Sequence, residues 1–354
     1  MDADLRASTG IEHLDNLLHG LIRLFERSFP TRIRNYYLGG SFSDGTAVGH
    51  GSSPNSSDVD LFVIFRGTVA EAESATFLHI VAQCQITSPI QVDAHAYSED
   101  DLLRQPRKDA TQTSFLNALI QEASVLVYGD DMRVDLPAIP FPHYVLDVIE
   151  SGVFHLGIPR QREGITYPLV TPLPFPFTYP NPTEEFYSYD VVPARPGAPR
   201  GTRVFVALTG WIATLILALE TGRYAAQKSQ SIRLCKEYLP DDKRTQLATT
   251  IYDTCKGAWG DALPNGTEDR ERLRSLCRDA LALENEYLHL CRDYVLTQLR
   301  DGGVEEKLQA TRILQNIIYP DEEIVMALQA LEYTADEGVR TGAAQALEKA
   351  SRRS

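Results

Sequence analysis

The chain has 354 residues, 43% of them hydrophobic and 23% charged, which is typical of a globular protein with two or three domains. Its formal net charge of −14 argues against binding to duplex DNA, which requires a basic face. The same charge suits a cationic partner, a bound metal or plain solubility. The five cysteines are widely spaced, and they form neither a disulfide framework nor a Cys-x-x-Cys zinc site. With no signal-peptide pattern at the start, we expect a cytoplasmic protein.

The first part of the sequence alternates helical and extended patterns. We expect helices near residues 8–28 (capped by Ser8-Thr9), 68–84 (capped by Thr68) and 111–122, with short ones from Ser41 and after Ser98, and strands near 33–38, 58–65, 89–97 and 124–129. Residues 1–133 therefore predict one domain built on a mixed sheet. From residue 202 onward the pattern is helical, so the expected fold class is α+β with an all-α C-terminal bundle.

The middle and the end of the chain differ from both patterns. Residues 134–200 contain 13 of the 20 prolines and many aromatic residues, which suits a linker, a lid or part of a binding wall. Residues 201–300 predict a helical domain, in which the apolar stretch 204–219 is a core helix because it is short for a membrane span. Residues 301–354 are similar to a HEAT-type repeat. They either cap the bundle or dock a protein or a second copy.

Two acidic residues interrupt the apolar segment DVDLFVIF. Alternation along a strand puts Asp58 and Asp60 on one face and the apolar residues between and after them on the other. Two carboxylates about 5 Å apart repel by roughly 3 kcal/mol at an effective dielectric of 20, so a cation is expected between them. Mg²⁺ is the usual choice for carboxylate and phosphate oxygens. In the next strand Asp93 shares a face with His95, and a third carboxylate there would allow two metal ions.

A glycine turn precedes this acidic strand. Gly39 and Gly40 allow backbone N–H groups to approach a phosphate closely, and Ser41 adds a hydroxyl at the start of a short helix. A metal site and a phosphate site are thus expected side by side, which suits a nucleoside triphosphate.

The motif Gly-Gly-Ser followed by Ser-Asp-Val-Asp-Leu, with Asp93 downstream, resembles the polymerase-β-type nucleotidyltransferase superfamily. SVLVYGD at 124–130 and the segment 218–253 are similar to the streptomycin/spectinomycin adenylyltransferase group among the aminoglycoside nucleotidyltransferases. The resemblance covers about residues 30–133 and 202–300. It implies a catalytic domain at 1–133, two Mg²⁺ ions, ATP as the expected nucleotide, and transfer of AMP to a hydroxyl of a small molecule.

The resemblance also assigns roles to residues. Asp58, Asp60 and Asp93 would bind the metals, with Asp93 also accepting a proton. Gly39, Gly40 and Ser41 would hold the phosphates, together with Lys228 and, as a lesser candidate, Arg223 from the helical domain. The glutamate base of the adenylyltransferase group has no recognisable motif here, so Glu184, Glu185 and Asp190 remain alternatives to Asp93. Sixteen residues separate Ser41 from Asp58, more than the family usually has.

Several alternatives remain open on this evidence. A polycationic aminoglycoside suits the acidic chain, but the acceptor could equally be a protein, a tRNA end or a second nucleotide. A non-catalytic antitoxin or regulatory binding protein with the same fold is the alternative of a different class. Neither duplex DNA nor a membrane is expected as a partner.

Overall fold

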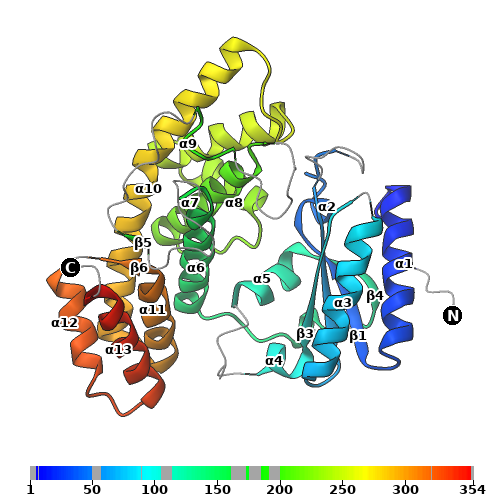
Figure 1. Cartoon of the computed structure of the whole chain (residues 1–354), viewed down its shortest axis with the longest axis horizontal. Coiled ribbons are helices and arrows are strands. Elements are labelled where there is room, and N and C mark those ends of the chain that lie inside the picture. Colours follow the sequence, from blue (N-terminus) through cyan, green and yellow to red (C-terminus); the bar gives the residue numbers. More distant parts are fainter. Residues whose placement is uncertain are drawn as a thin grey trace. The chain divides into compact units, whose positions relative to one another are not determined.

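The computed structural model describes residues 5–6, 8–49, 57–88, 90–104, 114–160, 173–174, 185–190, 200–319 and 321–351. The chain divides into two units, Met1–Ile139 and Pro140–Ser354. The first contains a mixed sheet with helices and the second is built from helices (Figure 1). The predicted α+β fold class is confirmed.

The first unit is organised by a four-stranded sheet in the order β3-β2-β1-β4. Its strands are β1 (Ile33–Leu38), β2 (Val59–Phe65), β3 (Val92–Ser98) and β4 (Val125–Gly129). β1 pairs antiparallel with β2 and with β4, whereas β2 pairs parallel with β3. The sheet is therefore mixed, as predicted.

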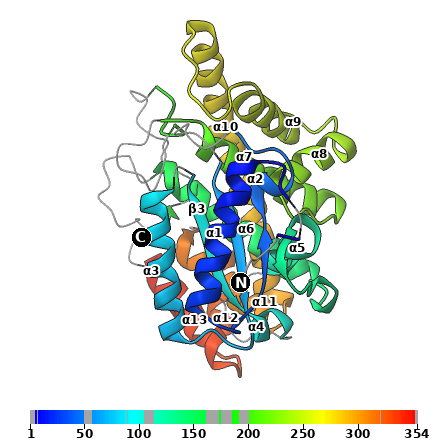
Figure 2. The same cartoon turned by 90° about the vertical axis from the view of Figure 1, so that its right-hand side faces the viewer.

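Two long helices, α1 (Glu12–Ser28) and α3 (Glu71–Thr87), cover one face of this sheet. Figure 2 shows them running over the sheet on the same side. The rings of Phe25 and Phe77 stack between the two helices with centroids 4.7 Å apart. The side chains of β2 that enter this core are those predicted to oppose the acids, namely Val59, Leu61, Val63 and Phe65.

The opposite face carries shorter elements: α4 (Glu99–Leu103), α5 (Ser114–Ala123) and the 3₁₀ turn Arg133–Asp135. Phe62 and Ile64 of β2 pack there in a second, smaller core, which also contains Leu102, Leu116, Ile120, Met132 and Leu136. Asp60 precedes these residues on the same strand face, so the acidic residues lie at the edge of this core. The short helix α2 (Gly40–Ser43) follows β1 and places Phe42 in the larger core.

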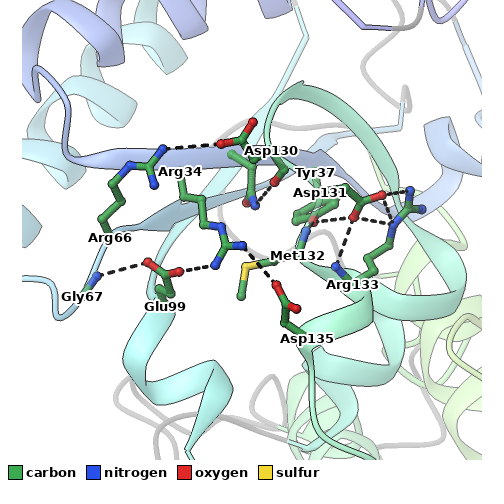
Figure 3. A network of polar contacts seen from close by, with 11 residues as sticks. Arg34, Tyr37, Arg66, Gly67, Glu99, Asp130, Asp131, Met132, Arg133 and Asp135 are labelled. Carbon is green, nitrogen blue, oxygen red and sulfur yellow. Dashed lines mark hydrogen bonds and ion pairs between the residues drawn. The ribbon is translucent and has the colours of Figure 1, made fainter.

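A polar network joins the strand ends furthest from the acidic residues (Figure 3). Arg34 forms ion pairs with Glu99 and, at 3.1 Å, with Asp135. The Tyr37 hydroxyl donates to Asp131 at 3.0 Å and accepts from the Met132 amide at 2.9 Å. These contacts tie β1 to the segments that follow β3 and β4.

The second unit contains α6 (Phe141–Arg160), α7 (Arg203–Thr221), α8 (Lys228–Tyr238), α9 (Lys243–Ile251), a π-helix (Tyr252–Ala258), α10 (Thr267–Asp301), α11 (Val304–Asn316), α12 (Glu322–Leu331) and α13 (Glu337–Ser351). A two-residue pairing joins β5 (Leu173–Pro174) to β6 (Ile317–Ile318).

The apolar stretch that the sequence marks as a core helix forms α7. Among the described residues, it is the one helix long and apolar enough to cross a membrane, and most of it is buried within the unit. Tyr189, from the proline-rich region, packs against Phe205 of α7 with ring centroids 4.7 Å apart. Its hydroxyl donates to the buried Glu284 of α10. Tyr189 therefore packs on the helices of this unit.

The last two helices pack on the rest of the helical unit. Arg292 of α10 forms ion pairs with Asp321 at 2.9 Å and with Glu323 of α12 at 2.5 Å. The hydroxyl of Thr311 on α11 lies so close to Gly342 of α13 that a Cβ there would approach it to 2.4 Å. A docking role for this tail remains a prediction.

Two predicted helix starts are wrong by three or four residues. Ser8 and Thr9 donate to Asp15 instead of capping, and α1 begins at Glu12. α3 begins after Ala70 and not at Thr68. Capping hydroxyls compete for several local partners, so these boundaries do not follow from residue type alone.

Glu73 anchors the start of α3 and generates a prediction about acid stability. It accepts hydrogen bonds from Arg32 at 2.6 and 2.9 Å and from the Ala70 amide at 2.9 Å. These bonds, chiefly that from Arg32, lower the pKa of Glu73 to about 2. A depressed carboxylate pKa stabilises the fold above the unfolded value near ~4.3, and the effect disappears as the pH falls toward 2.

We expect Arg32→Met to raise the pKa of Glu73 toward its ordinary value. Above pH 5 the free energy of unfolding should fall by about 1 kcal/mol or less, because the pair is partly exposed and screened by solvent. Near pH 2 the part of this loss that depends on the Glu73 charge should vanish, and what remains reflects the hydrogen bonds from Arg32 to the carbonyls of Arg66 and Thr68. Carboxyl NMR titration and urea denaturation measure the two effects. A Glu73 pKa that stays near 2 in the variant would contradict this assignment.

Candidate metal centre beside a glycine turn

Three acidic side chains meet where β2 and β3 begin. The parallel register places Asp60 directly beside Asp93, and Asp58 immediately precedes β2. One carboxylate oxygen from each residue lies within 4.8 Å of the others, and all three side chains are half-buried. The structure therefore brings together the three acids that the sequence pattern singled out.

The chemistry of this donor set fits a hard divalent cation. Like charges at this spacing repel by roughly 3 kcal/mol per pair at an effective dielectric of 20, and a cation between them reverses the sign of the interaction. Mg²⁺ and Mn²⁺ are bound in proteins through a few carboxylates, with water or phosphate oxygens completing the shell. Half-buried carboxylates leave access for such ligands.

The glycine turn lies directly against one of these acids. Gly40 has a φ of 64°, and a Cβ built on it would lie 1.7 Å from Oδ2 of Asp60. Gly39 donates its backbone N–H to the carbonyl of Asp60 at 2.9 Å. The turn thus packs directly on the Asp60 carboxylate, and any other residue at position 40 would have to displace that carboxylate and adopt a left-handed backbone.

The same contact limits which groups of the turn can hold a phosphate. The N–H of Gly39 already bonds within the sheet, and a Cβ at Gly39 would lie 2.4 Å from the Phe62 ring. Gly40 and Ser41 form the first turn of α2, which has four residues. The assignment of Gly39, Gly40 and Ser41 to the phosphates remains a prediction, with the amide of Gly39 serving the sheet.

A short clip closes the loop before Asp58. Ser57 donates its N–H to the Val48 carbonyl at 2.8 Å, and its hydroxyl accepts from the Val48 amide at 2.9 Å. Residues 50–56 of the long loop between Ser41 and Asp58 lie outside the described residues. These two hydrogen bonds fix the position of Ser57, the residue before Asp58. No pattern in the sequence predicts them.

The carboxylates of the cluster help to raise the pKa values of two further side chains on β3. Nε2 of His95 lies 2.8 Å from Oδ1 of Asp93, and this hydrogen bond is the main reason that the imidazole pKa is raised. Burial, followed by the charges of Asp93 and Asp60, raises the pKa of the Tyr97 hydroxyl to about 12. Strand alternation places His95 on the Asp93 face, but only the structure shows their contact.

Lys228 and Arg223 belong to the second unit. Lys228 begins α8, and its Nζ lies 5.6 Å from the centre of the Trp211 ring. Arg223 follows the left-handed Gly222 that ends α7, and its guanidinium lies 3.6 Å from the centre of the Tyr238 ring. Their assignment to the nucleotide phosphates remains a prediction.

The alternative bases have defined surroundings where they are described. Glu185 accepts from Arg270 at 3.0 Å and from Arg274 at 2.5 Å, and its pKa is lowered, chiefly by Arg270. Asp190 is buried and forms an ion pair with Arg200. Glu184 lies outside the described residues. A lowered pKa makes Glu185 a weaker proton acceptor.

No protein-family model matches the sequence, and no curated protein matches it significantly. One similar solved structure is the spectinomycin adenyltransferase AAD(9) from Enterococcus faecialis with ATP and spectinomycin. It is 15% identical in sequence and superposes with a TM-score of 0.40, over 76% of this chain and 100% of that chain. This sequence identity and this TM-score are too low to assign an activity. Any assignment of activity must be argued from the carboxylate cluster.

The contact between Gly40 and Asp60 generates a prediction with a matched control. Gly40→Ala should weaken Mn²⁺ binding, because the new methyl group displaces the Asp60 carboxylate. It should also cost about 1–2 kcal/mol of stability for the left-handed backbone. At Gly45 the φ is a similar 74°, but an added Cβ would meet no atom within 4 Å. Gly45→Ala should therefore lower the stability by a similar amount and leave Mn²⁺ binding unchanged. Isothermal titration and urea denaturation separate the effects. Equal metal affinity in the two variants would contradict the prediction.

The acidic cluster itself predicts metal-dependent stability. Because a ligand that binds only the folded state stabilises it by about 2.7 kcal/mol at 100 times its Kd, Mn²⁺ should raise the unfolding temperature by roughly 5–10 °C. Asp60→Asn should remove most of this shift, since it removes one ligand. Differential scanning fluorimetry with and without EDTA measures both. A shift that persists in Asp60→Asn would place the ion elsewhere.

Proposed function

We propose that this chain is a metal-dependent nucleotidyltransferase that transfers AMP from ATP to a hydroxyl group of a small molecule. The observation that carries the proposal is the meeting of Asp58, Asp60 and Asp93 beside Gly40. Carboxylates that hold cations next to a glycine turn are an arrangement suited to phosphoryl transfer, which depends mainly on positioning and charge neutralisation.

The reaction is a displacement at the α-phosphorus. A bond forms between the acceptor oxygen and the α-phosphorus, and the bond to the oxygen bridging toward the β-phosphorus breaks. Pyrophosphate leaves with that electron pair, and the acceptor proton passes to the carboxylate of Asp93. When bound, divalent cations supply neutralisation of the phosphate charge. Asp58 and Asp60 would hold them, and Gly40 supplies a side-chain-free approach to the cluster.

For the acceptor we propose a polycationic small molecule such as an aminoglycoside. The formal net charge of −14 favours cationic ligands over anionic ones, through long-range attraction. The sequence resemblance to the streptomycin/spectinomycin adenylyltransferase group supports the same class. Lys228 and Arg223 are assigned to the triphosphate in this proposal.

Pyrophosphate release tests the proposal directly. With Mg²⁺ and an aminoglycoside panel, we expect release from ATP in the presence of at least one compound. Asp60→Asn should reduce it to background, and Asp93→Asn should slow it by about 10²–10⁴-fold, as expected for loss of a proton acceptor. Full turnover in Asp60→Asn would refute the site. If no compound of the panel supports pyrophosphate release from ATP, aminoglycosides are excluded as the acceptor, and the proposal of nucleotidyl transfer to a different acceptor stands.

A further inference from the structure

His95 lies on β3 two residues after Asp93 and points from the same face of the sheet. Its Nε2 atom is 2.8 Å from Oδ1 of Asp93, and its side chain is 49% exposed. On the neighbouring strand, Phe62 is its partner in the parallel register. His95 is thus beside the acidic cluster and bonded to one of its members.

This hydrogen bond restrains the rotation of the Asp93 carboxylate. A carboxylate turns easily about its Cβ–Cγ bond, and the orientation of Asp93 decides which oxygen faces Asp60 and Asp58. A neutral imidazole protonated on Nε2 donates to Oδ1 without needing a positive charge. The contact therefore fixes the carboxylate plane in either protonation state of the ring.

We propose that His95 is a positioning residue, whose Nε2–H holds the Asp93 carboxylate in the orientation that completes the cation site. The inference rests on the metal site of the proposed function and adds a residue to it. Outer hydrogen-bond partners of metal ligands act in this way in general, and their loss typically costs about 10–100-fold in metal affinity.

A purely packing role for His95 makes the opposite prediction. The His95 ring lies 6.2 Å from that of Tyr97, centroid to centroid, so a phenylalanine at position 95 would preserve aromatic packing and lose the donor. Glutamine would lose the ring and place an amide N–H near the position of Nε2. Asparagine is shorter and would not reach. The order of the variants therefore distinguishes a hydrogen bond from packing.

The experiment measures the Kd of Mn²⁺ for the full chain at one fixed pH, by electron paramagnetic resonance or isothermal titration. We expect His95→Phe and His95→Asn to raise the Kd about 10–100-fold, and His95→Gln to bind nearly as the wild type does. His79→Phe is the matched control, because His79 is an exposed residue of α3, the helix that covers the other face of the sheet. Circular dichroism checks the fold of each variant.

The outcomes separate this inference from the proposed function. If Asp60→Asn loses Mn²⁺ while His95→Phe binds as the wild type does, the positioning role is refuted and the metal site stands. If glutamine is as weak as phenylalanine, the hydrogen bond is not what matters and the inference also fails. If the wild type does not bind Mn²⁺, both ideas fail together.

Discussion

The parallel pairing of β2 with β3 is the constraint on which the candidate site depends. It sets Asp60 and Asp93 side by side in one register, although the two like charges repel at that distance. A shift by one residue would turn one of them to the opposite, apolar face. The register is therefore what converts two separate acidic residues into a cluster.

The apolar faces and the far strand ends hold this register. Four residues of β2 are buried against α1 and α3, and this burial outweighs the repulsion, since each buried aliphatic or aromatic side chain contributes roughly 1.5–3 kcal/mol. At the other end of the strands, Arg34 ties β1 to the segment after β3, and the hydroxyl of Tyr37 ties β1 to Asp131 in the segment after β4 (Figure 3). The sheet therefore keeps the acids side by side although their charges repel.

Much of this arrangement follows from the sequence, and the rest does not. Alternation correctly separates Asp60 from Val59 and Leu61, because a strand has only two faces. It cannot name the neighbouring strand, which depends on α3 crossing between β2 and β3. Nor can it show that Gly40 touches Asp60 or that His95 reaches Asp93, because these contacts join segments set by tertiary packing. Helix starts fail where hydroxyls find other acceptors, as at Thr9.

The two acids paired in register are each held by a separate neighbour. Gly40 packs against Asp60 from the turn after β1, and His95 bonds to Asp93 from within β3. Each contact restricts the rotation of a carboxylate in the cluster. Sites that bind a cation in one geometry need such fixed ligands, because ordering them at the moment of binding would reduce affinity. Acids clustered by chance on a protein surface would have no need of a glycine with a left-handed backbone packed against one of their carboxylates.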